Sequence, residues 1–69
     1  MPETLTIRER EVVQLLAEGK TTLETAGILK VSAKTVETHR RNAMAKLKIY
    51  SVAELTKYAL REGLTFLND

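Results

Sequence analysis

The chain has 69 residues, of which 43% are hydrophobic and 29% are charged, with a net charge of +2 at pH 7 and no cysteine. This length and composition indicate one small folded domain rather than a disordered segment. The lack of cysteine argues against disulfides and thiolate metal sites, and the short apolar runs argue against a membrane span or signal peptide. We therefore expect a cytoplasmic domain without metal or cofactor.

The first helix is predicted over about residues 7–18. Thr6 and Glu9 have the spacing of a capping box, in which each side chain bonds the backbone amide of the other residue. Gly19 is the expected left-handed residue at the end of the helix. The predicted inward stripe consists of Val12, Leu15 and Leu16, with Val13 at its margin.

A second helix, over about 22–29, is predicted from another capping box, formed by Thr21 and Glu24. Only three residues then separate it from a longer helix over about 33–47, for which Ser32 is the expected N-cap. Two short helices, a tight turn and a basic helix after that turn are typical of the helix-turn-helix motif.

The third helix has three faces when its residues are placed about 100° apart. A narrow inward seam consists of Val36, Arg40, Ala43 and Leu47. The opposite, outward face has no large apolar side chain and consists of Lys34, Glu37, Thr38, Arg41, Ala45 and Lys48. A flank of hydrogen-bond donors lies between them and consists of Thr35, His39, Asn42 and Lys46.

Positive charge is concentrated on this part of the chain. Residues 30–48 contain six lysines or arginines and one glutamate, whereas the remaining residues contain five bases and eight acids. A charged helix face is often merely solvated, but a basic face in this position of a helix-turn-helix motif favours a polyanionic partner. We interpret the third helix as a DNA recognition helix.

A fourth helix, over about 52–62, is predicted from Ser51 and Glu54 as a third capping box and from Gly63 at its end. Its charged residues cover a narrow arc, so its apolar surface is wider than a monomer needs and suggests self-association. The expected dimerisation set is Val52, Ala53, Thr56 and Leu60, and the expected core-facing set is Leu55, Tyr58 and Ala59, although the two sides could be exchanged. After the helix, Leu64, Phe66 and Leu67 are expected to fold back onto the body.

With these elements in order, the chain resembles the LuxR/NarL/GerE-type helix-turn-helix domain of bacterial transcriptional regulators. The resemblance rests on L-T-I-R-E-R-E-V-V-Q-L-L-A-E-G at 5–19, V-S-A-K-T-V-E-T-H-R-R-N-A-M-A-K-L at 31–47 and S-V-A-E-L-T-K-Y-A-L-R-E-G-L at 51–64. It implies an all-α, four-helix domain with the third helix in the major groove and the fourth mediating dimerisation. It also implies the output half of a response regulator, as in two-component systems, or of a ligand-sensing activator.

The chain departs from the family pattern at three positions. Thr25 and Ala43 stand where isoleucine is usual, and Val52 stands where arginine is frequent. Thr25 and Ala43 are smaller than isoleucine and reduce the apolar volume of the core. Val52 removes a possible phosphate contact or ion pair near the fourth helix.

Base contacts are expected from the side chains that point furthest into the groove. The outward arc and the matching family positions agree on Glu37, Thr38 and Arg41, with Lys34 at the edge. Arg41 can bond O6 and N7 of guanine together, and Thr38 can touch a thymine methyl group. Glu37 can accept from a cytosine amine, or it can instead pair with Arg41 one turn further along the helix.

Phosphate contacts would position the domain without reading sequence. The candidates are Thr21, Thr22, Lys34, Thr35, His39, Asn42 and Lys46. Asn42 could equally brace the backbone, and His39 could make a buried structural hydrogen bond. Arg40 is expected to pair with Glu9 or Glu11 of the first helix, or to reach a phosphate.

We expect the domain to cover 5–67, with tails at 1–4 and 68–69. The sequence has no glycine-rich phosphate loop and no nucleophile with a base partner, so an enzyme is not expected. The expected partners are double-stranded DNA and a second copy of the chain, weakly bound in solution, with RNA polymerase as a further candidate and neither a membrane nor a small-molecule ligand. The alternatives are a sigma-factor-like promoter-reading domain and a helical protein-interaction module that uses the fourth helix.

Overall fold

A computed structural model describes residues 5–64, in which four helices and no strand occur. The helices are α1 (Ile7–Ala17), α2 (Thr22–Leu29), α3 (Ala33–Leu47) and α4 (Val52–Arg61). The predicted all-α fold class is confirmed, and every predicted helix boundary agrees with the structure to within one residue. The expected tails at 1–4 and 68–69, together with Phe66 and Leu67, lie outside the described residues. No helix within 5–64 is long and apolar enough to cross a membrane.

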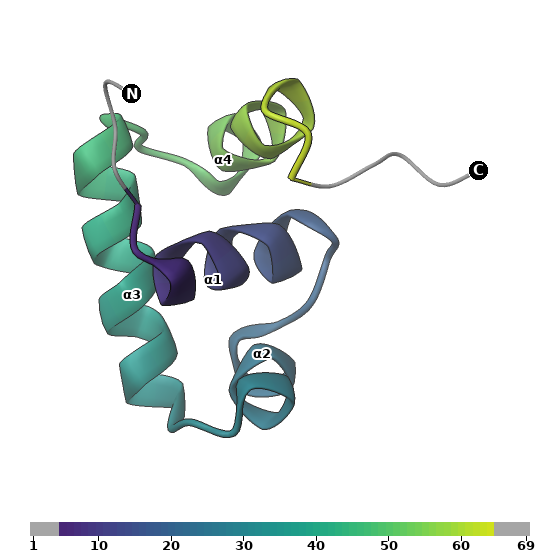
Figure 1. The fold of residues 1–69 in the computed structure, drawn as a ribbon, viewed down its shortest axis with the longest axis vertical. Coiled ribbons are helices and arrows are strands. Elements are labelled where there is room, and N and C mark those ends of the chain that lie inside the picture. Colours follow the sequence, from purple (N-terminus) through teal and green to yellow (C-terminus); the bar gives the residue numbers. More distant parts are fainter. Residues whose placement is uncertain (1–4, 65–69) are drawn as a thin grey trace.

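Helix α1 is at the centre of the domain. It packs against α2, α3 and α4, while α2 also packs against α3. In Figure 1, α2 and α4 lie on opposite sides of α1, and α3 runs along the edge of the molecule, across the N-terminal end of α1. Within the described part of the chain, one long side of α3 is therefore left free of other helices.

Two adjacent valines of α1 divide the core into two clusters. Val12 packs with Ala26 and Val36, where α1 meets α2 and α3. Val13 packs with a second cluster that consists of Leu5, Ala43, Leu55 and Ala59, with Leu64 against it as predicted. Both valines are fully buried, so the prediction that Val13 lies at the margin is wrong. Its burial comes from Leu5, Ala43 of α3 and two residues of α4, and the periodicity of α1 cannot indicate the positions of these residues.

Hydroxyl side chains cap the helix starts. Thr6 and Thr21 form complete capping boxes, as predicted. Ser51 forms only half of the predicted third box, because the Glu54 carboxylate accepts from the amide of Tyr50 at 3.1 Å instead. The Ser51 hydroxyl still accepts from the Glu54 amide at 3.2 Å. The Ser51 backbone is more extended, with φ of −150° against −67° and −76° at the two threonines, and this directs its own amide differently.

All four helices end in the same motif, in which a left-handed residue is followed by an amide that bonds the carbonyl five residues earlier. The four amides are those of Lys20, Val31, Ile49 and Leu64. Glycine occupies the left-handed position after α1 and α4, as predicted, with φ of 94° at Gly19 and 73° at Gly63. Lysine occupies it after α2 and α3, with φ of 58° at Lys30 and 56° at Lys48, and the sequence pattern does not predict this.

Candidate nucleic-acid interface

The inward seam of α3 holds this helix against α1, α2 and α4. Val36 and Ala43 are fully buried, and Leu47 packs against the cluster around Val13. These positions confirm the predicted seam and determine which side of α3 faces outward. Arg40, the remaining seam residue, is only half-buried.

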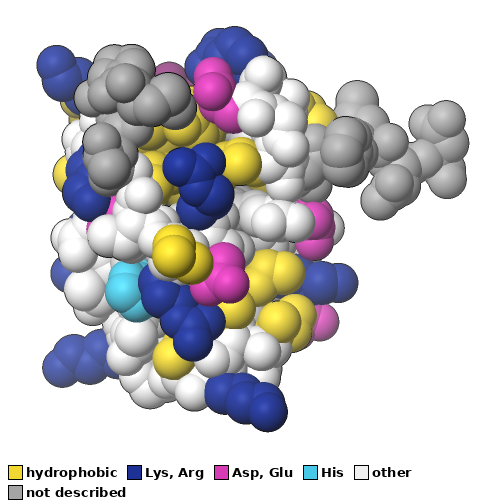
Figure 2. Space-filling view, viewed as in Figure 1, with side chains coloured by type: hydrophobic (Ala, Val, Ile, Leu, Met, Phe, Trp, Pro, Cys, Tyr) yellow, Lys and Arg dark blue, Asp and Glu magenta, His cyan; other side chains and the backbone are white. Residues whose placement is uncertain are grey.

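The outward face of α3 is exposed along its length. Glu37 is half-buried, and the exposed members are Lys34, Thr38, Arg41, Ala45 and Lys48. Among the ion pairs formed within residues 5–64, none includes Lys34, Arg41 or Lys48. Figure 2 shows basic side chains projecting at the edge of the molecule that α3 occupies in Figure 1. This face therefore offers positive charge that can interact with an external anion.

Glu37 is held in place by two internal hydrogen bonds. Arg40 donates from Nε to Oε1 at 2.7 Å, and Thr22, at the start of α2, donates its hydroxyl to Oε2 at 3.3 Å. The bond from Arg40 holds the pKa of Glu37 below its ordinary value, although burial opposes this. The pair forms between neighbours three residues apart on the helix, so the alternative pair of Glu37 with Arg41 is wrong.

The predicted pair of Arg40 with Glu9 or Glu11 is also wrong, because Arg40 binds Glu37, while Glu9 binds Lys46 and Glu11 binds Arg8. The Lys46 ammonium donates to Oε1 of Glu9 at 2.7 Å, and the Thr6 amide donates to the same oxygen at 2.9 Å. The Glu9 side chain is only 5% exposed, so this contact joins the start of α1 to the last turn of α3 in a largely buried setting. Burial raises the pKa of Glu9, but the bonds from Lys46 and Thr6 outweigh it and the net shift is downward.

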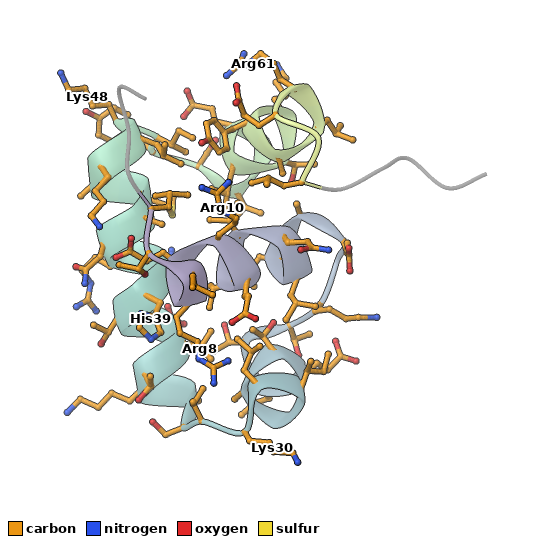
Figure 3. All side chains as sticks on the ribbon, in the orientation of Figure 1. Arg8, Arg10, Lys30, His39, Lys48 and Arg61 are labelled. Atoms are coloured by element: carbon orange, nitrogen blue, oxygen red, sulfur yellow. The ribbon has the colours of Figure 1, made fainter. Side chains whose placement is uncertain are left out.

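The donor flank of α3 has a mixed environment. His39 is half-buried and Asn42 is exposed. Figure 3 shows His39 projecting from the middle of α3, beside the start of α1. Thr35 accepts a hydrogen bond at 2.9 Å from the hydroxyl of Ser32, which caps α3. At the start of α2, Thr21 is exposed. The flank and the α2 start therefore border the outward face with further hydrogen-bonding groups.

Helix α4 separates into a core side and a solvent side. Leu55 and Ala59 are fully buried, and Tyr58 packs against the core, which confirms the predicted core-facing set. On the other side, Val52 is 52% exposed. Ala53 is exposed as well, while Thr56 and Leu60 are half-buried. A largely apolar strip therefore lies at the surface of α4.

Sequence periodicity does not predict two features of this region, namely the contact of Glu9 with Lys46 and the backbone conformation of Lys48. The Glu9–Lys46 contact joins residues 37 positions apart, and no local pattern indicates it. Lys48 is a member of the outward face, but its left-handed conformation at the end of α3 has no signal in the hydrophobic pattern.

Comparison with known proteins identifies the family. Residues 3–59 match the family model described as "Bacterial regulatory proteins, luxR family". The chain belongs to this family. Its members are DNA-binding transcription regulators, so this LuxR-family chain is a DNA-binding domain and not an enzyme. The assignment favours the LuxR-type interpretation over the sigma-factor-like one.

Curated relatives of this LuxR-family domain include regulators of several kinds. It is 57% identical over 60 residues to the uncharacterized response regulatory protein YgeK of Escherichia coli K12, covering 87% of the chain and 41% of YgeK. It is 48% identical over 59 residues to the spore germination protein GerE of Bacillus subtilis, covering 86% of the chain and 80% of GerE. It is 45% identical over 60 residues to the oxygen regulatory protein NreC of Staphylococcus carnosus, covering 87% of the chain and 28% of NreC. The chain thus spans less than half of YgeK and NreC.

Solved structures show the same fold. The transcription factor GerE superposes with a TM-score of 0.79 at 38% identity, covering 93% of this chain and 96% of GerE. A Vibrio cholerae VqmA–ligand–DNA complex superposes with a TM-score of 0.79 at 34% identity, covering 93% of this chain and 28% of VqmA. The four-helix architecture is therefore that of known DNA-binding regulators.

Proposed function

We propose that this LuxR-family domain, over about 5–67, is the output domain of a two-component response regulator that acts in the cytoplasm. In this proposal α3 enters the major groove, and α4 pairs two copies of the domain on an operator with two half-sites. The observation that carries the proposal is the exposed outward face of α3, whose Lys34, Arg41 and Lys48 form no ion pair within the described residues. The relative named as a response regulatory protein, YgeK, supports the regulatory context. RNA polymerase is a further proposed partner.

Four residues of the outward face are proposed to contact bases: Lys34, Glu37, Thr38 and Arg41. The Arg41 guanidinium is exposed and can bond O6 and N7 of a guanine together. The Thr38 hydroxyl donates to the Lys34 carbonyl at 3.1 Å, which leaves the methyl group to contact a thymine methyl. The Glu37 carboxylate, held by Arg40 and Thr22, can accept from a cytosine amine without losing side-chain freedom on binding.

Phosphate contacts are proposed for the residues that border this face: Thr21, Thr22, Lys34, Thr35, His39 and Asn42. They lie at the start of α2 and on the donor flank of α3, so they can meet the DNA backbone beside the groove. Lys46 is assigned to the fold rather than to DNA, because its ammonium is bonded to the buried carboxylate of Glu9.

The proposed dimerisation surface is the exposed side of α4, with Val52, Ala53, Thr56 and Leu60. Pairing about a two-fold axis would present two α3 helices to successive major grooves, about one helical turn apart. A patch of this size is below that of a stable interface, so we expect a monomer in dilute solution that pairs when DNA brings two copies together.

Selection of bound duplexes from a random pool tests the groove and pairing proposals together. We expect enrichment of two similar half-sites in two-fold arrangement, with centres about 10 base pairs apart or a multiple of this spacing. A pool without enriched sequence, under conditions where the chain is folded, would contradict sequence-specific binding.

Leu60→Glu then tests the α4 surface on the selected duplex. Its matched control is Ile28→Glu, because Ile28 is an apolar residue that is 52% exposed on α2. We expect Leu60→Glu to abolish cooperative binding to two half-sites while affinity for one half-site stays within about threefold, a change below 1 kcal/mol. Equal losses on both duplexes would place Leu60 in the core and the dimerisation surface elsewhere.

A further inference from the structure

The two left-handed lysines are an unusual feature of this fold. A positive φ is unfavourable for any residue with a Cβ atom, and glycine is the usual residue at such a position. Helices α1 and α4 end in the same motif with Gly19 and Gly63, so nothing in the motif itself requires a longer side chain. The left-handed lysines therefore raise the question of what their side chains do.

The helix dipole does not distinguish Lys48 from Lys30. A lysine at a helix C-terminus interacts favourably with the dipole, and this applies equally to Lys30 after α2 and to Lys48 after α3. The two residues also have similar surroundings in sequence, Leu29-Lys30-Val31 and Leu47-Lys48-Ile49, and both are exposed. They differ in where their side chains point.

Lys48 continues the outward face of α3, whereas Lys30 does not. Lys48 lies seven residues after Arg41, which is two helical turns and about 10 Å along the axis. In Figure 3, Lys48 projects away from the body at one end of α3, on the side opposite α1. Lys30 projects from the end of α2, away from the exposed side of α3.

We infer that Lys48 binds a phosphate of the DNA backbone at the C-terminal end of α3. The inference rests on the proposed function, which places α3 in the major groove. Helix α3 has 15 residues and is about 22 Å long, whereas the groove is about 12 Å wide, so a helix that crosses the groove at an angle brings its end to the backbone that borders the groove. The left-handed backbone turns the Lys48 side chain out of the helix end while Ile49 packs against the core.

Lys48→Gly and Lys30→Gly form a matched pair of tests on the 69-residue chain. Each substitution removes a favourable interaction of the lysine with a helix dipole, but glycine adopts the positive φ without the strain of a Cβ atom, so both variants should keep or raise the melting temperature. On a single selected half-site, Lys48→Gly should weaken binding about threefold to tenfold and make the slope of log K against log salt shallower by about one. Lys30→Gly should leave both the affinity and the slope unchanged.

Three outcomes would overturn the inference: an unchanged salt slope for Lys48→Gly, equal losses for the two glycine variants, or a loss in Lys48→Arg as large as in Lys48→Gly. Lys48→Arg keeps the charge and should retain the wild-type slope. Arg41→Ala distinguishes this inference from the proposed function. If Arg41→Ala loses base preference while Lys48→Gly behaves as wild type, only the role of Lys48 fails; if the wild-type chain selects no duplex, both fail.

Discussion

The inner and outer sides of α3 use basic residues for different purposes. Arg40, on the inward seam, is paired with Glu37, and Lys46, on the donor flank, is paired with the buried Glu9. The outer side presents cations that form no ion pair within residues 5–64, namely Lys34, Arg41 and Lys48. The number of positive charges on α3 therefore overstates the number that the fold leaves available to an external anion. Position relative to the packed helices decides which charges stabilise the fold and which can bind phosphate or bases.

The largest expected effect is on the inner side, at Val36. Val36→Ala should lower the free energy of unfolding by about 2–3 kcal/mol, because the valine is fully buried between α1, α2 and α3. Thr38→Ala, two residues later on the exposed face, should change it by less than about 0.5 kcal/mol. Chemical denaturation measures the free energy of unfolding of both variants. Similar values for the two variants would mean that the inner and outer sides of α3 are wrongly assigned.

Lys46→Ala should lower the free energy of unfolding by about 1–2 kcal/mol, because Glu9 would lose a charged hydrogen-bond partner in a largely buried site. The Lys46 side chain is 40% exposed, so solvent screening keeps the effect below that of a fully buried pair. Arg41→Ala is the matched control and should be close to neutral for stability. A stable Lys46→Ala variant with a shallower salt slope on DNA would instead make Lys46 a phosphate contact.

The contact between Glu9 and Lys46 predicts that the free energy of unfolding depends on pH. The pKa of Glu9 is lowered in the fold, so its contribution to stability is present above the ordinary value of 4.5 and is lost as pH falls through the native value. Between neutral pH and pH 3, Lys46→Ala should therefore lose less stability than the wild-type chain does. Denaturant titrations of both chains across this range measure the difference. Parallel profiles would show that the Glu9–Lys46 contact contributes little.

Local sequence signals predicted the helices because each signal acts within a few residues. Thr6 and Thr21 form their capping boxes with the residue three positions later, and Gly19 ends α1 where it was expected. The wrong predictions concern contacts made by packing. Val13 is buried by Leu5 and residues of α3 and α4, and Glu9 is bonded by Lys46, which no periodicity within α1 indicates. For the interface, the pattern located the outward face of α3, but it could not separate paired cations from unpaired ones.

Thr25 extends the comparison to the interior of the domain, where a smaller effect on stability is expected than at Val36 or Lys46. Glu9 is buried with its hydrogen bonds made, whereas Thr25 is fully buried and its hydroxyl has no hydrogen-bond partner within the described residues. Thr25→Val keeps the shape and removes the unpaired hydroxyl, so it should raise the free energy of unfolding by about 1 kcal/mol. For a domain of this size, that is a rise of about 4–8 °C in melting temperature. An unchanged or lower melting temperature would show that the hydroxyl finds a partner in solution.

The most direct test of the central claim is the base preference of Arg41→Ala on the selected duplex, measured against every single-base substitution of one half-site. We predict that stability is unchanged, that affinity falls by about 1–3 kcal/mol on the preferred site, and that preference is lost at one base pair while the other positions keep theirs. If the variant kept full preference at every position, the outward face of α3 would not read sequence through Arg41, and the separation of structural from DNA-binding cations on this helix would be contradicted.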